Sequence, residues 1–186
     1  FFNVEYSQSL TFFDQAHALA LQFGWHAQAT YLQCYRAMAY CALGDMQNAE
    51  AIMREAATAL GDNVFANSAM NWASSQLAAA RGDYATALDQ ATIASASARA
   101  AGFTLLEIVT GLPGAVYALE QGDVERTAVI GAHIRELSGG TMWRFPQCLL
   151  SAIDCELHLR HGEPAAGLAA LRETLRLAHN PRMAAF

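Results

Sequence analysis

The sequence predicts an all-α protein, a solenoid of antiparallel helix hairpins, and three observations carry this prediction. Alanine, the strongest helix former, supplies 39 of the 186 residues, whereas proline occurs only four times. A two-residue mark, glycine followed by an acidic residue, recurs at intervals of 38, 40 and 40 residues. Apolar residues recur at helical spacing between the marks. A fixed period of this size is typical of repeat arrays, in which stacked hairpins share a core.

Two kinds of turn divide the chain into helices. The recurring mark is the first kind, and it stands at Gly44-Asp45, Gly82-Asp83, Gly122-Asp123 and Gly162-Glu163. The second kind lies between the marks, at Gly24-Trp25, Gly61-Asp62, Gly102-Phe103 and Gly139-Gly140. Glycine just past a helix is the usual left-handed stop, and a following aspartate can cap the next helix. The predicted helices are 6–23, 26–43, 46–60, 64–81, 84–101, 104–121, 124–138, 143–161 and 164–179.

These turns predict a leading helix, 6–23, followed by four hairpins of about 40 residues. Residues 1–186 then form a single repeat domain, with repeats at about 25–62, 63–102, 103–141 and 142–180. Because the chain opens at Phe1 with no initiator methionine, we expect a fragment of a longer protein.

The second helix of each hairpin carries an apolar stripe that is predicted to face a core. The four stripes are Met46, Ala49, Ile52, Met53, Ala56 and Leu60; Tyr84, Ala87, Leu88, Ala91, Ala94 and Ala98; Val124, Ala128, Gly131 and Leu137; and Leu168, Leu171, Leu175 and Ala178. One hairpin cannot bury such a face alone, whereas stacked neighbours can.

The turn motifs resemble the helix-turn-helix core of a tetratricopeptide repeat. The clearest example joins Gly82-Asp83-Tyr84 to Ala87-Leu88, and looser versions join Gly44-Asp45 to Ala49 and Gly122-Asp123 to Ala128. The resemblance covers about 25–179 and implies a right-handed solenoid. The spacing near 40 exceeds the usual tetratricopeptide period of about 34. It is similar to that of the long repeats in bacterial ATP-dependent LuxR-type transcription activators of the maltose-activator kind.

In that family a helical-repeat sensor domain follows an ATPase module and precedes a DNA-binding helix-turn-helix. The resemblance therefore implies a non-catalytic sensor or regulatory domain of a bacterial transcription regulator, which binds a small-molecule effector or a protein. The alternative is a protein–protein interaction scaffold that grips an extended peptide or a partner helix. A third class is a structural module that self-associates as a homodimer.

Composition argues against several other classes of protein. The net charge is −6, lysine is absent and the 11 arginines are scattered, so direct nucleic acid binding by this segment is not expected. Without lysine the chain has no Gly-x-x-x-x-Gly-Lys phosphate loop. No window holds the ~18–20 apolar residues of a membrane span. Cys34 and Cys41, like Cys148 and Cys155, are seven residues apart on a helix, too far to bridge, which fits a reducing cytoplasm.

Catalytic and metal-binding constellations are also not expected. Asp154, Cys155 and His158 have helical ligand spacing, but His161 belongs to a turn and no second ligand cluster is evident. Solvated surface and core explain these residues better. No nucleophile elbow and no Cys/His constellation stand out. We therefore expect no enzyme activity, no metal and no cofactor.

Alignment of the first helices on the glycine mark gives a stripe of polar or small residues, a candidate ligand groove. Its members are Ala29, Gln33 and Arg36; Asn67, Asn71 and Ser74; Glu107, Gly111 and Gly114; and Gln147, Ser151 and Asp154. Either these groups hydrogen-bond a peptide or small ligand, or the stripe is solvated surface. Gly111-Leu112-Pro113-Gly114 interrupts helix 104–121 and marks either a pocket or a close helix crossing.

The tetratricopeptide pattern instead places the concave surface on a neighbouring stripe. That stripe holds Tyr31, Cys34, Tyr35, Met38, Trp72, Gln76, Val109 and Leu112. These residues are either core or a hydrophobic ligand trough. The candidate binding residues from both stripes are Gln33, Arg36, Asn67, Asn71, Trp72, Ser74, Gln76, Glu107, Gly111, Gln147 and Ser151.

Overall fold

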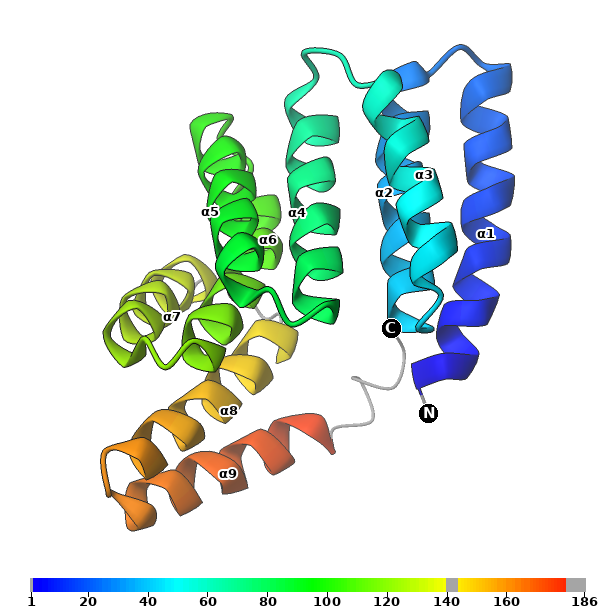
Figure 1. The fold of residues 1–186 in the computed structure, drawn as a ribbon. Coiled ribbons are helices and arrows are strands. Elements are labelled where there is room, and N and C mark those ends of the chain that lie inside the picture. Colours follow the sequence, from blue (N-terminus) through cyan, green and yellow to red (C-terminus); the bar gives the residue numbers. More distant parts are fainter. Residues whose placement is uncertain (1, 140–143, 180–186) are drawn as a thin grey trace. The chain divides into compact units, whose positions relative to one another are not determined.

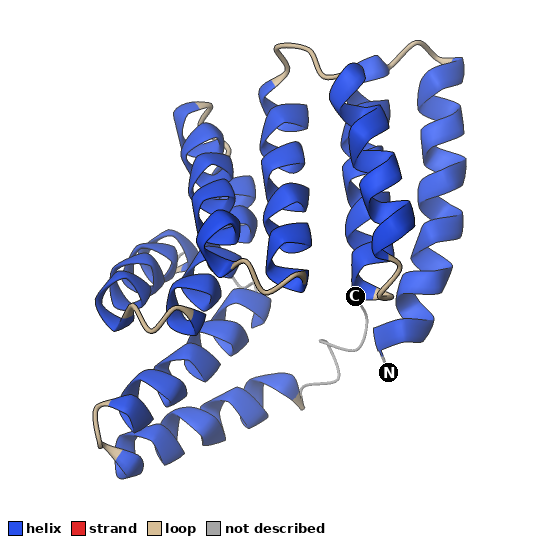
Figure 2. Cartoon of the chain, in the orientation of Figure 1, coloured by secondary structure: helices blue, strands red, loops and turns tan. Residues whose placement is uncertain are grey.

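A computed structural model describes residues 2–139 and 144–179, and the side chains of 6–139 and 145–179. Within these ranges the chain consists of helices joined by short loops, with no strand (Figure 1, Figure 2). The prediction of an all-α fold is therefore confirmed. The helices are α1 (Phe2–Gln22), α2 (His26–Ala42), α3 (Met46–Thr58), α4 (Val64–Ala80), α5 (Tyr84–Ala100), α6 (Thr104–Glu120), α7 (Val124–Ser138), α8 (Arg144–Arg160) and α9 (Pro164–Ala178).

At six of the turns, a glycine in the left-handed conformation ends the preceding helix. At the first mark, the N–H of Gly44 donates to the carbonyl of Cys41, and the N–H of Asp45 donates to the carbonyl of Tyr40. This pair of bonds defines a Schellman motif, which satisfies carbonyls at the helix end. The same pair recurs at each glycine whose φ lies between 70° and 81°, namely Gly24, Gly44, Gly82, Gly102, Gly122 and Gly162.

The aspartates of the mark cap the helices that follow, as predicted. The carboxylate of Asp45 accepts from the backbone N–H of Asn48 at 3.1 Å. Asp83 and Asp123 do the same one and two hairpins later, at 3.1 and 2.9 Å. Each cap satisfies an N–H that the first helical turn leaves without a partner.

Two of the predicted left-handed stops are wrong. Gly139 ends α7 with a φ of −61°, and Gly61 does not have a positive φ. The loop between α3 and α4 is set instead by Asn63, whose side chain accepts from the N–H of Ala66 at 3.0 Å. Gly140 lies outside the described residues.

The chain forms two compact units, Phe1–Thr110 (unit 1) and Gly111–Phe186 (unit 2). The boundary falls inside α6, at the Gly111-Leu112-Pro113-Gly114 segment. The helix continues through this segment even though Pro113 cannot donate a backbone hydrogen bond. Among the described residues, no helix combines the length and the apolar character needed to cross a bilayer.

The core of unit 1 is built from small and sulfur-containing residues. Helix α2 packs against α1, α3 and α4, and α4 packs against α5. The central cluster holds Cys34, Ala37, Met38, Ala49, Ile52, Met53, Ala56, Ala69, Met70, Ala73 and Leu77. The apolar stripes predicted for α3 and α5 are confirmed, since their central residues are buried.

The stripes predicted for unit 2 differ from the structure in both of its second helices. Helix α7 buries the predicted Gly131, but it exposes Ala128, and it also buries Thr127, Ile134 and Ser138, which were not predicted. Helix α9 exposes its predicted stripe of Leu168, Leu171, Leu175 and Ala178. The reason lies at Gly167, where an added Cβ would lie 3.2 Å from the Leu159 side chain. The small face of α9 therefore packs closely on α8, which turns the leucines outward.

Candidate functional site

The polar stripe predicted as a groove is closed at several positions. Gln33 and Glu107 are only 5% and 4% exposed, and Gly111 is buried. The guanidinium Nε of Arg99 lies 2.6 Å from the carboxylate of Glu107 and forms an ion pair with it. Ser151 is buried and donates to the carbonyl of Ala170 at 2.9 Å. Contrary to the expected open stripe, these groups lie inside the fold.

Other members of the stripe also bond within the protein. Arg36 lies 2.7 Å from the carboxylate of Asp14 on α1. Asn67 donates to the carbonyl of Gly61, and Asn71 donates to the carbonyl of Asn67. The remaining candidates differ in exposure, since Ser74 and Gln76 are half-buried and Gln147 is exposed. Of the predicted binding residues, those from Gln33 to Glu107 in the sequence belong to unit 1. The other three, Gly111, Gln147 and Ser151, belong to unit 2.

Unit 1 carries a connected set of aromatic side chains, which we call the aromatic surface. Its members are Phe13 of α1, Tyr31 and Tyr35 of α2, Phe65 and Trp72 of α4, and Phe103, which directly precedes α6. Tyr35 is the centre, with ring centroids 5.7 Å from Phe13, 4.8 Å from Tyr31 and 5.6 Å from Trp72. Phe65 lies 5.9 Å from Tyr31 and 4.4 Å from Phe103. These separations are typical of attractive ring pairs.

The rings lie at the edge of the core and not within it. Phe65 and Phe103 are 39% and 38% exposed, and the other four rings are half-buried. Tyr31, Tyr35 and Trp72 pack against the central cluster of alanine, methionine and leucine. Aromatic residues usually dominate a core because they bury the most surface. Here alanine and methionine fill the core, and the rings form a layer between it and water.

Three polar groups belong to the aromatic surface. The hydroxyls of Tyr31 and Tyr35 are 2.9 Å apart and share a hydrogen bond. Burial, followed by this hydrogen bond, raises the pKa of Tyr35 far above its ordinary value, so its phenol stays neutral. The indole Nε1 of Trp72 is buried and has no hydrogen-bond partner within the described part of the chain. The surface thus combines apolar area with a phenol pair and an unused N–H donor.

Sequence reasoning found half of this surface. The stripe suggested by the tetratricopeptide pattern contains Tyr31, Tyr35 and Trp72, while its other members in α2 belong to the core. Phe13, Phe65 and Phe103 were not predicted. One signal was present, since Phe103 follows Gly102 as Trp25 follows Gly24, which places an aromatic residue at two of the four turns of the second kind.

The candidate metal ligands of α8 have other partners. Both carboxylate oxygens of Asp154 bond Arg135, at 2.8 and 2.7 Å, and Nδ1 of His158 lies 2.7 Å from Glu163. No three His, Cys, Asp or Glu side chains come together as a ligand group among the residues that the structure describes. Burial raises the pKa of the Cys34 thiol to about 12, so this thiol is not a ready nucleophile near neutral pH.

Comparison with known proteins identifies no relative of this chain. No family model matches it, and neither a curated protein nor a solved structure does. The arrangement of the side chains is therefore the basis on which its function can be argued.

Proposed function

We propose that this chain is a non-catalytic binding domain that holds its ligand on the aromatic surface of unit 1. The supporting observation is that six rings from separate segments contact one another while remaining partly open to water. Rings of this kind dominate the energetics of protein interfaces and line many small-molecule sites. Rings that only filled space would be expected to lie within the core.

An extended peptide or a small effector with apolar groups is the ligand that fits this chemistry. Its apolar groups would cover Phe65 and Phe103, the most exposed rings of the surface. The N–H of Trp72 is buried, so an acceptor on the ligand would reach it only if the neighbouring rings moved. That bond would remove the cost of a buried donor without a partner, which is about 1–3 kcal/mol.

The architecture we propose is a right-handed, tetratricopeptide-like solenoid with a repeat of about 40 residues. The recurrence of one turn conformation at Gly44, Gly82, Gly122 and Gly162 supports it. So does the packing of α2 on α4 in unit 1, because these are the first helices of successive hairpins. Small-angle scattering tests the proposal, since a solenoid gives an elongated distance distribution and a compact bundle does not.

We propose as the biological setting a sensor domain in a LuxR-type bacterial transcription regulator acting in the cytoplasm. This part rests on the resemblance of the turn motifs and their spacing. It predicts that the parent polypeptide has an upstream phosphate loop and a downstream DNA-binding helix-turn-helix. Other flanking domains would favour the alternative, a scaffold for an extended peptide or partner helix.

A thermal-shift screen of metabolites and peptides tests the ligand surface. A compound that binds only the folded chain raises its melting temperature. We expect the double variant Phe65→Ser/Phe103→Ser to lose the shift given by such a compound. Phe12→Ser is the matched control, because Phe12 is 68% exposed and lies outside the aromatic surface. Equal shifts in all three proteins would place the ligand elsewhere.

A further inference from the structure

The aromatic surface is a row of rings and not a ring of side chains around one point. Its contacts run from Phe13 through Tyr35, Tyr31 and Phe65 to Phe103, and the four centroid separations along this path total about 21 Å. An extended chain advances about 3.3 Å per residue, so at most about six residues of a peptide would follow the row. An extended peptide therefore covers more of these rings than a small effector could.

Unit 1 has an excess of carboxylates, and each of its arginines is already paired. Residues 6–110 hold eight carboxylates and four arginines, which gives a net charge of −4 with histidine counted as neutral. The ion pairs are Arg36 with Asp14, Arg54 and Arg81 with Glu50, and Arg99 with Glu107. An anionic group on a ligand would therefore have to break an existing pair before it could bind a guanidinium of this unit.

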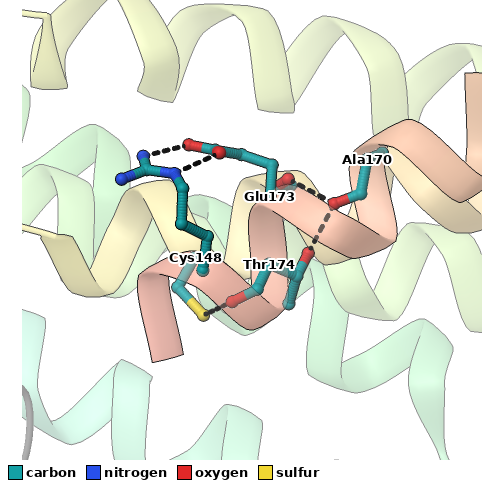
Figure 3. Close-up of polar contacts among 6 residues, drawn as sticks. Cys148, Ala170, Glu173 and Thr174 are labelled. Carbon is teal, nitrogen blue, oxygen red and sulfur yellow. Dashed lines mark hydrogen bonds and ion pairs between the residues drawn. The ribbon is translucent and has the colours of Figure 1, made fainter. Parts of the chain in front are cut away.

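This balance of charge distinguishes unit 1 from unit 2. In α9 of unit 2, Arg176 pairs with Glu173 within the helix (Figure 3). Arg172 of the same helix is exposed and has no ion-pair partner among the described residues. Unit 2 thus presents a guanidinium that an anion could reach, whereas the described part of unit 1 has every guanidinium held by a carboxylate.

One carboxylate close to the rings remains unpaired. Arg36 directly follows Tyr35, but it is occupied by Asp14 at 2.7 Å. Asp62 is exposed and has no ion-pair partner in the part of the chain that the structure describes. The residues on either side of it are hydrogen-bonded to the first turn of α4, at 2.9 and 3.0 Å. Phe65 belongs to that turn, so Asp62 adds negative charge to the exposed end of the aromatic surface.

We propose that the aromatic surface binds an extended peptide segment in which arginine side chains accompany apolar ones. This inference rests on the proposed function, because it names the ligand of that same surface. The faces of aromatic rings are negative, and the planar, weakly hydrated guanidinium of arginine stacks on them more readily than an ammonium group. The excess carboxylates of unit 1 attract arginine and repel acidic peptides, which adds charge selectivity to the apolar contacts.

A displayed library of random hexapeptides tests both the length and the charge of the ligand. Peptides are selected on the 186-residue chain, and those that also bind Phe65→Ser/Phe103→Ser are discarded. We expect the remaining peptides to be enriched in arginine and depleted in aspartate and glutamate. Enrichment of neutral or acidic peptides would overturn the inference and leave the ligand surface in place. The inference also fails if no peptide depends on the two rings, but a metabolite that moves the Trp72 resonance would still support the proposed function.

Two matched exchanges isolate the effect of charge. A selected hexapeptide is made with arginine and with citrulline, which is similar in shape but uncharged, and we expect citrulline to weaken binding about fivefold or more in fluorescence anisotropy. Asp62→Asn should weaken binding of the arginine peptide about twofold to threefold and leave the citrulline peptide unaffected. Asp89→Asn is the control, because it removes an exposed carboxylate of α5, which contributes no ring to the aromatic surface. Equal affinities of the two peptides, or equal effects of the two substitutions, would overturn the proposal.

Discussion

At the scale of the residue, the turn glycines are selected for backbone conformation alone. Gly82 has a φ of 78°, and a Cβ added to it would have no heavy atom within 4 Å. A side chain at this position would therefore meet no steric clash. It would meet only the intrinsic cost of the left-handed region, which is about 1–2 kcal/mol for an L-residue.

Gly82→Ala should therefore lower the free energy of unfolding by about 1–2 kcal/mol. Gly61→Ala is the matched control, because Gly61 also has open space around its Cβ position but no positive φ. We expect the control to be neutral or slightly stabilising, since alanine has less freedom than glycine in the unfolded chain. Urea unfolding of both variants checks this, and equal losses of stability would contradict it.

The cap at Asp83 should make stability depend on pH. Hydrogen bonds from the side chain and the backbone N–H of Thr86 lower the pKa of Asp83 below its ordinary value of 3.8. The folded state thus binds this proton more weakly than the unfolded state, so the contribution is present above pH 3.8 and is lost as pH falls through the folded pKa. Melting curves should show that Asp83→Ala is less stable than wild type near neutral pH, and that the gap narrows in acid.

Asp62→Ala serves as the control for the cap, because Asp62 is exposed and precedes the capping residue of α4. Its removal should cause little change at any pH. If the difference in melting temperature between wild type and Asp83→Ala stayed constant as the pH fell, the carboxylate would not be the source of the effect.

Residue-scale features were largely predictable because they are local. Glycine stops and aspartate caps depend on two to four consecutive residues, and the sequence shows those directly. Gly61 and Gly139 were the exceptions. At Gly61 the nearby Asn63 provides a different way to start the next helix, and no rule for glycine alone could reveal this.

At the scale of the element, the positions of the helices were predictable but two of their packing faces were not. Helix α9 has an apolar stripe that would be read as a core face on periodicity alone. The actual packing face is small, because Gly167 lets α8 approach closely. Which face a helix buries depends on the shape of its neighbour, and hydrophobic periodicity does not contain that information.

Alanine substitutions of the leucines in α9 should destabilise the fold in the reverse of the order that hydrophobic periodicity suggests. Leu177 is 4% exposed, so Leu177→Ala should lower the free energy of unfolding by about 2–4 kcal/mol. Leu171 is 43% exposed, so Leu171→Ala should cost less than about 1 kcal/mol. Chemical unfolding of the two variants measures the difference. A larger loss for Leu171→Ala would mean that Leu168, Leu171 and Leu175 are covered in the folded chain.

At the scale of the whole molecule, the candidate surfaces depend on tertiary structure. The aromatic surface draws rings from α1, α2, α4 and the turn before α6, so its members lie as far apart in sequence as Phe13 and Phe103. Their common location follows from the packing of α1 and α4 on α2. Sequence periodicity could place Tyr31 and Tyr35 on one helical face, but it could not show that rings from other helices join them.

In the proposed function the ligand binds on the aromatic surface. The NMR resonances of the tryptophan indole N–H groups test this most directly. In a proton–nitrogen correlation spectrum, the N–H of Trp72 reports on the aromatic surface, and that of Trp25 reports on a separate ring pair with Phe23. We predict that a ligand from the thermal-shift screen will move the Trp72 resonance in a saturable way and leave that of Trp25 in place. Saturable binding that left the Trp72 resonance unmoved would contradict the account.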